Sequence, residues 1–190
     1  MSETDVRTLH RRALEAFGEK VMAIRDDQWH GPTPCTDWDV RTLVNHLVSE
    51  NRWMSPLLAG KTIADVGDAL DGDLLGADPK TAWSDSATEA LEAIRAPGSM
   101  ERTVHASFAD ISGEEYATQV FTDLVIHGWD LARGIGADER MDPELLEAAY
   151  VKIKPMVDAF KAGGMYGPHV EPPPGADLQT RLLALVGRVA

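Results

Sequence analysis

The sequence predicts an all-α protein, a four-helix bundle with long loops and a short C-terminal helix. Apolar residues recur at spacings of three and four in several long stretches, which is typical of helices with one buried face. The alternating pattern that indicates strands is not sustained anywhere in the chain. Segments rich in proline and glycine separate the periodic stretches, and four long helices joined by loops favour a bundle.

The first half of the chain is expected to form two long helices. An amphipathic first helix is predicted over about residues 5–27, from Val6, Leu9, Leu14, Phe17, Val21 and Ile24. Residues 30–35 contain a glycine and two prolines and are expected to be a loop. Thr36 and Asp39 resemble a capping box, which would open a second helix through about Leu58. Residues 61–78 are rich in Asp and Gly and are expected to be a long loop.

Proline and serine signals organise the second half. Pro79 and Pro143 each fit the first turn of a helix, and Ser112 followed by Glu115 predicts a helix N-terminus. The expected elements are a third helix over about 79–95, a short extended segment over 102–108, a fourth helix from 113 to about 134, a fifth helix over 143–160, a loop over 163–174 and a closing helix over 177–188.

Length and composition describe one ordinary globular domain over residues 1–190, with 44% apolar and 26% charged residues. The formal charge of −13 argues against nucleic acid and against anionic membrane surfaces, since little here could neutralise phosphates. No apolar run approaches the roughly 20 residues of a membrane span, and the N-terminus has no signal-peptide core, so a cytoplasmic location is expected. A single cysteine, Cys35, excludes an intrachain disulfide and a cysteine-rich zinc site.

Asp123 and His127 are the strongest functional signal in the sequence. They lie four residues apart in a predicted helix, so both side chains project from one face and can reach one divalent metal. His46, which lies among apolar residues of the second helix, is the best third ligand. Three protein ligands with open positions are typical of a catalytic metal site. Because buried polar groups need partners, a hydrogen-bonded core network is the alternative interpretation. Asp130 is a candidate to orient an imidazole of the site or is a solvated acid.

The remaining candidates are weaker. Cys35 precedes the second helix, where a reactive thiolate is conceivable. It is expected to be a small buried hydrophobe, too far along the helix axis from His46 to be a ligand. His10 is expected on a solvated face beside two arginines, and His30 and His169 on loop surfaces. His105 has no neighbour at ligand spacing.

Three segments resemble one known family. Residues 33–48, which contain His46, resemble the opening motif of the DinB-like family. The similarity is greatest to its actinobacterial branch, related to the metal-binding N-terminal domain of mycothiol-dependent maleylpyruvate isomerase. Residues 123–133 resemble the histidine-bearing helix of that branch, and residues 166–188 its closing segment. Together the three segments cover the chain almost end to end.

The resemblance implies a four-helix bundle that holds one divalent metal, usually zinc or nickel. Carried over, its ligands are His46, Asp123 and His127, with Asp123 one methylene shorter than the glutamate of the isomerase. It also implies a low-molecular-weight thiol such as mycothiol, activated at the metal to attack a small-molecule electrophile in an S-transfer or isomerisation. A metal-dependent hydrolase and a non-catalytic metal-binding or stress-response module are the alternatives. DinB-like bundles often pair, so a homodimer is a further expectation.

Overall fold

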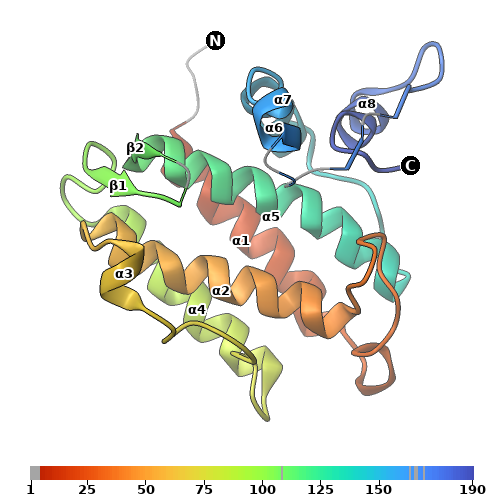
Figure 1. The fold of residues 1–190 in the computed structure, drawn as a ribbon. Helices are drawn as coiled ribbons and strands as arrows, with labels where there is room; N and C mark the ends of the chain where they lie inside the picture. Colours follow the sequence, from red (N-terminus) through yellow and green to blue (C-terminus); the bar gives the residue numbers. More distant parts are fainter. Residues whose placement is uncertain (1–4, 108, 163, 165–166, 169) are drawn as a thin grey trace.

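The computed structural model describes residues 5–107, 109–162, 164, 167–168 and 170–190. The predicted all-α fold is confirmed, and its four long helices form the bundle (Figure 1). These are α1 (Val6–Ala23), α2 (Val40–Leu58), α4 (Pro79–Arg95) and α5 (Gly113–Ile135). Within the described ranges, every helix is too short or too polar to serve as a membrane span.

The packing of the bundle places α2 beside α5. Helix α1 packs mainly on α5, and α2 mainly on α4, while a further contact joins α2 to α5. Large apolar side chains that are almost wholly buried fill the centre, among them Phe17, Leu43, Leu47, Phe121 and Trp129. Because the inward faces of α2 and α5 meet, polar side chains on those faces are brought close together.

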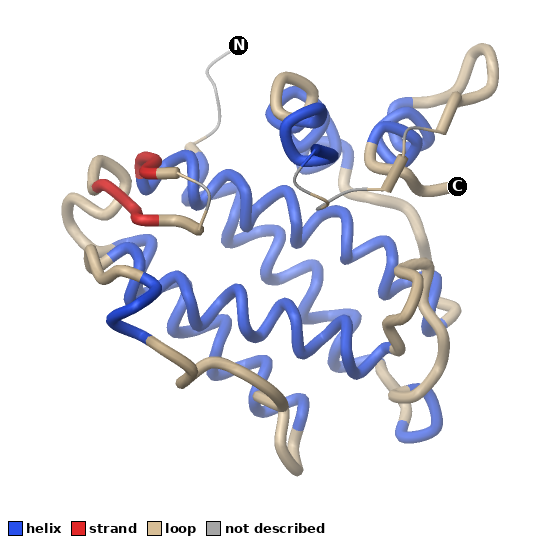
Figure 2. The backbone as a smooth tube through the Cα atoms, viewed as in Figure 1, coloured by secondary structure: helices blue, strands red, loops and turns tan. Residues whose placement is uncertain are grey.

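The smaller elements surround this core. Figure 2 shows two short strands at one end of the bundle, and three helices lie beyond α5, on the side away from α2 and α4. The strands pair antiparallel, with Val104 opposite Ile111. These elements are α3 (Ile63–Val66), β1 (Thr103–His105), β2 (Asp110–Ser112), α6 (Pro143–Ile153), α7 (Val157–Ala162), α8 (Leu178–Leu185) and the 3₁₀ turn η1 (Asp26–Gln28).

Helix ends follow the local chemistry, with one correction. Ser112 and Glu115 form the expected capping box at the start of α5. At α2, however, the N-cap is Asp39, whose side chain accepts a hydrogen bond from the backbone N–H of Thr42. Thr36 therefore lies in the preceding loop. Helix α5 ends at Gly136, which adopts a left-handed conformation that glycine tolerates.

Several other boundaries differ from the expectation, and the closing helix, α8, ends at Leu185 rather than at residue 188. The fifth helix is two helices, with Pro155 between α6 and α7, because a proline has no backbone N–H for the helical hydrogen bond and favours a break there. The first helix ends at Ala23, and a 3₁₀ turn follows it. The loop over 61–78 contains one helical turn, α3, which Thr62 and Asp65 stabilise with a capping box. His169 lies outside the described residues.

Candidate metal centre

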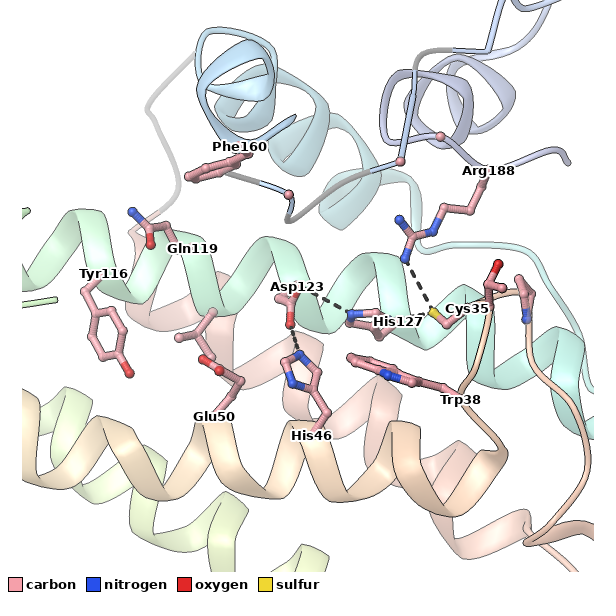
Figure 3. A pocket seen from close by; sticks show the side chains of 16 residues that line it. Cys35, Trp38, His46, Glu50, Tyr116, Gln119, Asp123, His127, Phe160 and Arg188 are labelled. Atoms are coloured by element: carbon pink, nitrogen blue, oxygen red, sulfur yellow. Dashed lines mark hydrogen bonds and ion pairs between the residues drawn. The ribbon is translucent and has the colours of Figure 1, made fainter. Parts of the chain in front are cut away.

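The structure brings the three predicted site residues together between α2 and α5. The Nε2 atom of His46 lies 2.9 Å from Oδ2 of Asp123, and the Nε2 atom of His127 lies 3.5 Å from Oδ1 of the same carboxylate (Figure 3). One ligand atom from each residue lies within 4.8 Å of those of the other two. A carboxylate on α5 is therefore shared by imidazoles from two helices.

Local sequence explains this convergence. Asp123 and His127 are one turn apart on α5, and the apolar residues around them bury that face of the helix. His46 lies between Leu43 and Leu47 on α2, both of which are fully buried. The same burial that forms the bundle core thus directs the polar groups toward one another.

The trio opens onto a cavity. The side chains of His46 and Asp123 remain 28% and 24% exposed, whereas that of His127 is only 8% exposed. All three line a cavity of about 680 Å³, together with residues of the C-terminal region such as Phe160 and Arg188. A ligand in this cavity can therefore reach the trio.

Mutual charge stabilises the ionised forms of the pair on α5. Burial alone would raise the pKa of Asp123, but His127 and His46 lower it to about 2. Burial alone would lower the pKa of His127, but Asp123 and Asp130 raise it above its usual value. The trio is thus a tightly coupled acid–imidazole cluster, with Asp123 as its anion.

Asp130 lies directly behind His127. Its Oδ2 atom is 2.9 Å from Nδ1 of His127, and the Asp130 side chain is fully buried. Nη2 of Arg188 donates to the same oxygen at 3.0 Å, and the Cys35 thiol donates to it at 3.2 Å. Of the two interpretations of Asp130, the partner of an imidazole matches the geometry, and the solvated acid does not.

Cys35 is closer to the site than its sequence position indicates. The loop before α2 folds back, with Pro32 bridging to Asp39, so the Cys35 sulfur lies 3.7 Å from Nδ1 of His127. Burial and the charge of Asp130 raise the pKa of the Cys35 thiol to about 12. The sulfur is consequently held as a protonated donor, and a reactive thiolate is disfavoured.

Several lining residues were missed by the sequence reasoning, among them Glu50, Trp38, Phe160 and Arg188. Glu50 lies one helical turn after His46, a spacing that could have identified it, and burial together with Asp123 raises its pKa. The Trp38 ring lies 4.9 Å from the His46 ring and 5.6 Å from the His127 ring. Phe160 and Arg188 come from the far end of the chain, and no local pattern marks them.

His10, His30 and His105 do not line the cavity. The expectation that His10 lies on a solvated face was wrong, because its side chain is fully buried and neither ring nitrogen has a hydrogen-bond partner among the described residues. Burial lowers the pKa of His10 to about 4. His30 and His105 each pair with one aspartate, Asp39 and Asp110, toward the surface.

The donor set fits a divalent cation. A tetrahedral zinc with bonds near 2.0–2.1 Å separates its donor atoms by about 3.3 Å. The two nitrogen–oxygen distances, 2.9 Å to Oδ2 and 3.5 Å to Oδ1 of Asp123, are close to that value, and one ligand atom from each residue lies within 4.8 Å of the other two, so side-chain movements would admit the ion. Two imidazoles and one carboxylate suit zinc, nickel, iron or manganese.

A second cluster, Cys35, His127 and Asp130, also has its ligand atoms within 4.8 Å of one another. It shares His127 with the first set but presents the opposite ring nitrogen. Arg188 already donates to both Cys35 and Asp130, at 3.6 and 3.0 Å. A cation would have to displace this guanidinium, so the open, anionic side at Asp123 is favoured.

The chain is similar to known proteins over most of its length. The family described as the mycothiol maleylpyruvate isomerase N-terminal domain matches residues 10–132. Two uncharacterized proteins of Mycobacterium tuberculosis, from strain CDC 1551 / Oshkosh and strain ATCC 25618 / H37Rv, are each 32% identical over 136 residues. Each alignment covers 72% of this chain and 70% of the relative. No solved structure matches the chain significantly.

Proposed function

The chain belongs to the mycothiol maleylpyruvate isomerase N-terminal domain family, and on that premise we propose that it is a divalent-metal-binding, thiol-dependent transferase or isomerase. Family membership supports metal binding. The observation that carries the proposal is the convergence of His46, Asp123 and His127 at the wall of a cavity of about 680 Å³. Zinc or nickel is the proposed ion, and a low-molecular-weight thiol such as mycothiol is the proposed co-substrate.

The ion would supply one kind of chemistry, a lowered pKa for a thiol or water bound beside it. The protein residues hold the ligand groups and shape the cavity. Trp38 packs against both imidazoles and restricts their rotation. Glu50 has a raised pKa, which supports a role as acceptor of the proton that a thiol loses when its sulfur forms a bond to carbon.

The cavity favours a reaction over a purely structural ion. Structural sites close all coordination positions with protein ligands, whereas catalytic sites combine three protein ligands with an open position. Phe160 and Tyr116 give the cavity apolar surface, and Gln119 adds an uncharged hydrogen-bonding group. These groups suit a small organic electrophile next to the thiol.

Metal content of untagged protein, measured by mass spectrometry, is the first test. About one zinc or nickel per chain is expected in the wild type, lost in folded His46→Ala and His127→Ala variants. His105→Ala is the matched control, because it also removes a histidine–aspartate pair but leaves the cavity intact. A wild-type chain that takes up neither ion after incubation with both would overturn the proposal.

Turnover is tested separately on the metal-loaded protein. The rate of conjugation of mycothiol with an aryl halide is compared with the rate for the chelator-treated protein. Thiol-dependent turnover that requires the metal supports the transferase proposal. Metal-dependent hydrolysis of an ester without any thiol would instead favour the hydrolase. Full metal loading without either reaction would favour the binding module.

A further inference from the structure

Arg188 enters the site from the C-terminal segment. It lies after α8, in residues that the family match does not include. Its side chain is only 12% exposed, although arginine is seldom buried without a partner. Nη2 donates to Oδ2 of Asp130 at 3.0 Å, Nε lies 3.4 Å from Oδ1, and Nη1 donates to the carbonyl of Val186.

The partner of Arg188 is a fully buried carboxylate. A buried acid is costly unless it is paired, and losing the partner leaves an uncompensated charge. Among the described contacts of Asp130, Arg188 supplies a guanidinium, beside the Cys35 thiol and the His127 ring. Arg188 therefore holds the Asp130 carboxylate in place behind His127.

The position of the Asp130 carboxylate determines how the His127 ring is oriented. The carboxylate accepts a hydrogen bond from Nδ1 of His127 at 2.9 Å, which fixes the ring and its tautomer. The opposite nitrogen, Nε2, then faces Asp123 and the cavity. A chain of contacts thus runs from Arg188 through Asp130 and His127 to the proposed ligand position.

We propose that Arg188 is a positioning residue of the metal centre, and that metal binding is coupled to docking of the C-terminal segment, residues 178–189. The inference rests on the proposed metal site and extends it to a segment outside the family match. Coupling between two binding events is reciprocal. Removing the Arg188 contact weakens metal binding, and metal binding strengthens the docking of the segment.

The chain offers a matched control for docking itself. Nη1 of Arg133 donates to the carbonyl of Val189 at 2.7 Å, so Arg133 anchors the same segment without a described contact to Asp130. Arg133→Met removes this anchor, together with the guanidinium over the Trp129 ring and the ion pair with Glu139. Comparing this variant with Arg188→Met distinguishes the effect of loosening the segment from the effect of removing the guanidinium beside Asp130.

The experiment measures zinc affinity by competition with a chromophoric chelator, and the visible absorption spectrum of the cobalt-substituted protein. Arg188→Met is expected to bind zinc about 10-fold more weakly, with an altered cobalt spectrum, since outer partners of metal-bound histidines have effects of this size. Arg188→Lys keeps the charge and recovers part of the affinity. It also serves if Arg188→Met does not fold, as judged by circular dichroism. Arg133→Met is expected to lose clearly less zinc affinity than Arg188→Met, because it loosens the segment but leaves the contact between Arg188 and Asp130 in place.

A double-mutant cycle tests the route of the effect. If Arg188 acts through Asp130, the double variant Asp130→Asn/Arg188→Met binds zinc as Asp130→Asn does, within about 2-fold. Hydrogen exchange in residues 178–189 is expected to slow when zinc is added to the wild type. The inference would be overturned if the losses of zinc affinity in the two single variants added up in the double variant. It would also be overturned if Arg188→Met bound zinc as tightly as the wild type, or if Arg133→Met lost as much affinity as Arg188→Met. Absence of metal from the wild type would overturn the proposed function as well, which distinguishes the two failures.

Discussion

His127 and Asp130 are joined by a 2.9 Å contact through Nδ1, while the opposite nitrogen of the same ring lies 3.5 Å from Asp123. One imidazole therefore serves two carboxylates with different surroundings. Asp130 is fully buried behind the ring, and Asp123 faces the cavity. The first carboxylate orients the ring, and the second shares the proposed ligand position.

The two carboxylates are expected to respond differently to the same substitution. Asp123→Asn removes a ligand charge, so stoichiometric zinc or nickel should be lost. Asp130→Asn keeps the three ligands and should keep about one metal per chain, with an affinity about 10–100-fold weaker. Mass spectrometry measures the metal content of the two variants, and competition with a chelator measures their metal affinity. Full metal loading of Asp123→Asn would contradict the ligand assignment.

Metal binding should stabilise the folded chain. An ion that binds only the folded state adds about 2.7 kcal/mol when its free concentration is 100 times Kd. The midpoints of thermal and urea unfolding of the wild type should therefore rise when zinc is added, and fall to their original values when excess chelator is added. His46→Ala is expected to show no such shift. An equal shift in this variant would place the stabilising ion elsewhere.

His10 should make stability fall in mild acid. Its pKa is about 4 in the folded chain and about 6.5 when unfolded. Between these pH values His10 binds a proton in the unfolded chain but not in the folded chain. The contribution of neutral His10 to the free energy of unfolding is therefore complete above pH 6.5 and is lost as the pH falls toward 4. The loss is about 2 kcal/mol near pH 5. His10→Leu should remove this part of the pH dependence in urea unfolding of metal-free protein.

A control for this prediction removes a buried side chain that cannot titrate. Leu14 lies in the same buried stripe as His10. Leu14→Ala should therefore lower the free energy of unfolding by a similar amount at every pH. If the free energy of unfolding depended on pH in the same way in His10→Leu and in the wild type, the prediction would be wrong, because burial would then not disfavour the charged form of His10.

Two glycines of α5 are predicted to respond in opposite directions. A Cβ atom at Gly113 would lie 1.9 Å from the carbonyl oxygen of Ser99, so Gly113→Ala must displace backbone and should cost about 3 kcal/mol. At Gly128 the nearest atom, on Phe17, is 3.9 Å away, which is ordinary contact. Gly128→Ala should stabilise the helix by about 0.5–1 kcal/mol. Urea unfolding measures the free energy of unfolding of both variants. The prediction is refuted if Gly113→Ala is the more stable of the two.

Local spacing predicted the parts of the site that one helix carries. Asp123 and His127 are one turn apart, and His46 stands in an apolar stripe, so their inward direction follows from the helix period. The same period marks His10, which continues the stripe of Val6 and Leu14 and was wrongly expected on a solvated face because of its charged neighbours. Position in the stripe decides burial more strongly than the type of the adjacent residue.

Long-range contacts explain what sequence reasoning missed. Cys35 reaches Asp130 because the loop before α2 folds back across α5, and Arg188 reaches it because the C-terminal segment docks there. Neither contact has a periodic signature, since each joins segments that are far apart in the chain. The break between α6 and α7 is different: Pro155 was visible in the sequence, and the local rule for interior proline would have predicted it.

Trp38 gives the chain an intrinsic optical probe of its own site. Its ring lies against both imidazoles, whereas Trp83 packs on Phe17 and Trp129 lies beneath Arg133. Indole emission responds to nearby charge and to exclusion of water. Entry of an ion or a thiol should thus change the fluorescence of Trp38 selectively, and Trp38→Phe should abolish that change. Binding can then be followed in unlabelled protein, in real time.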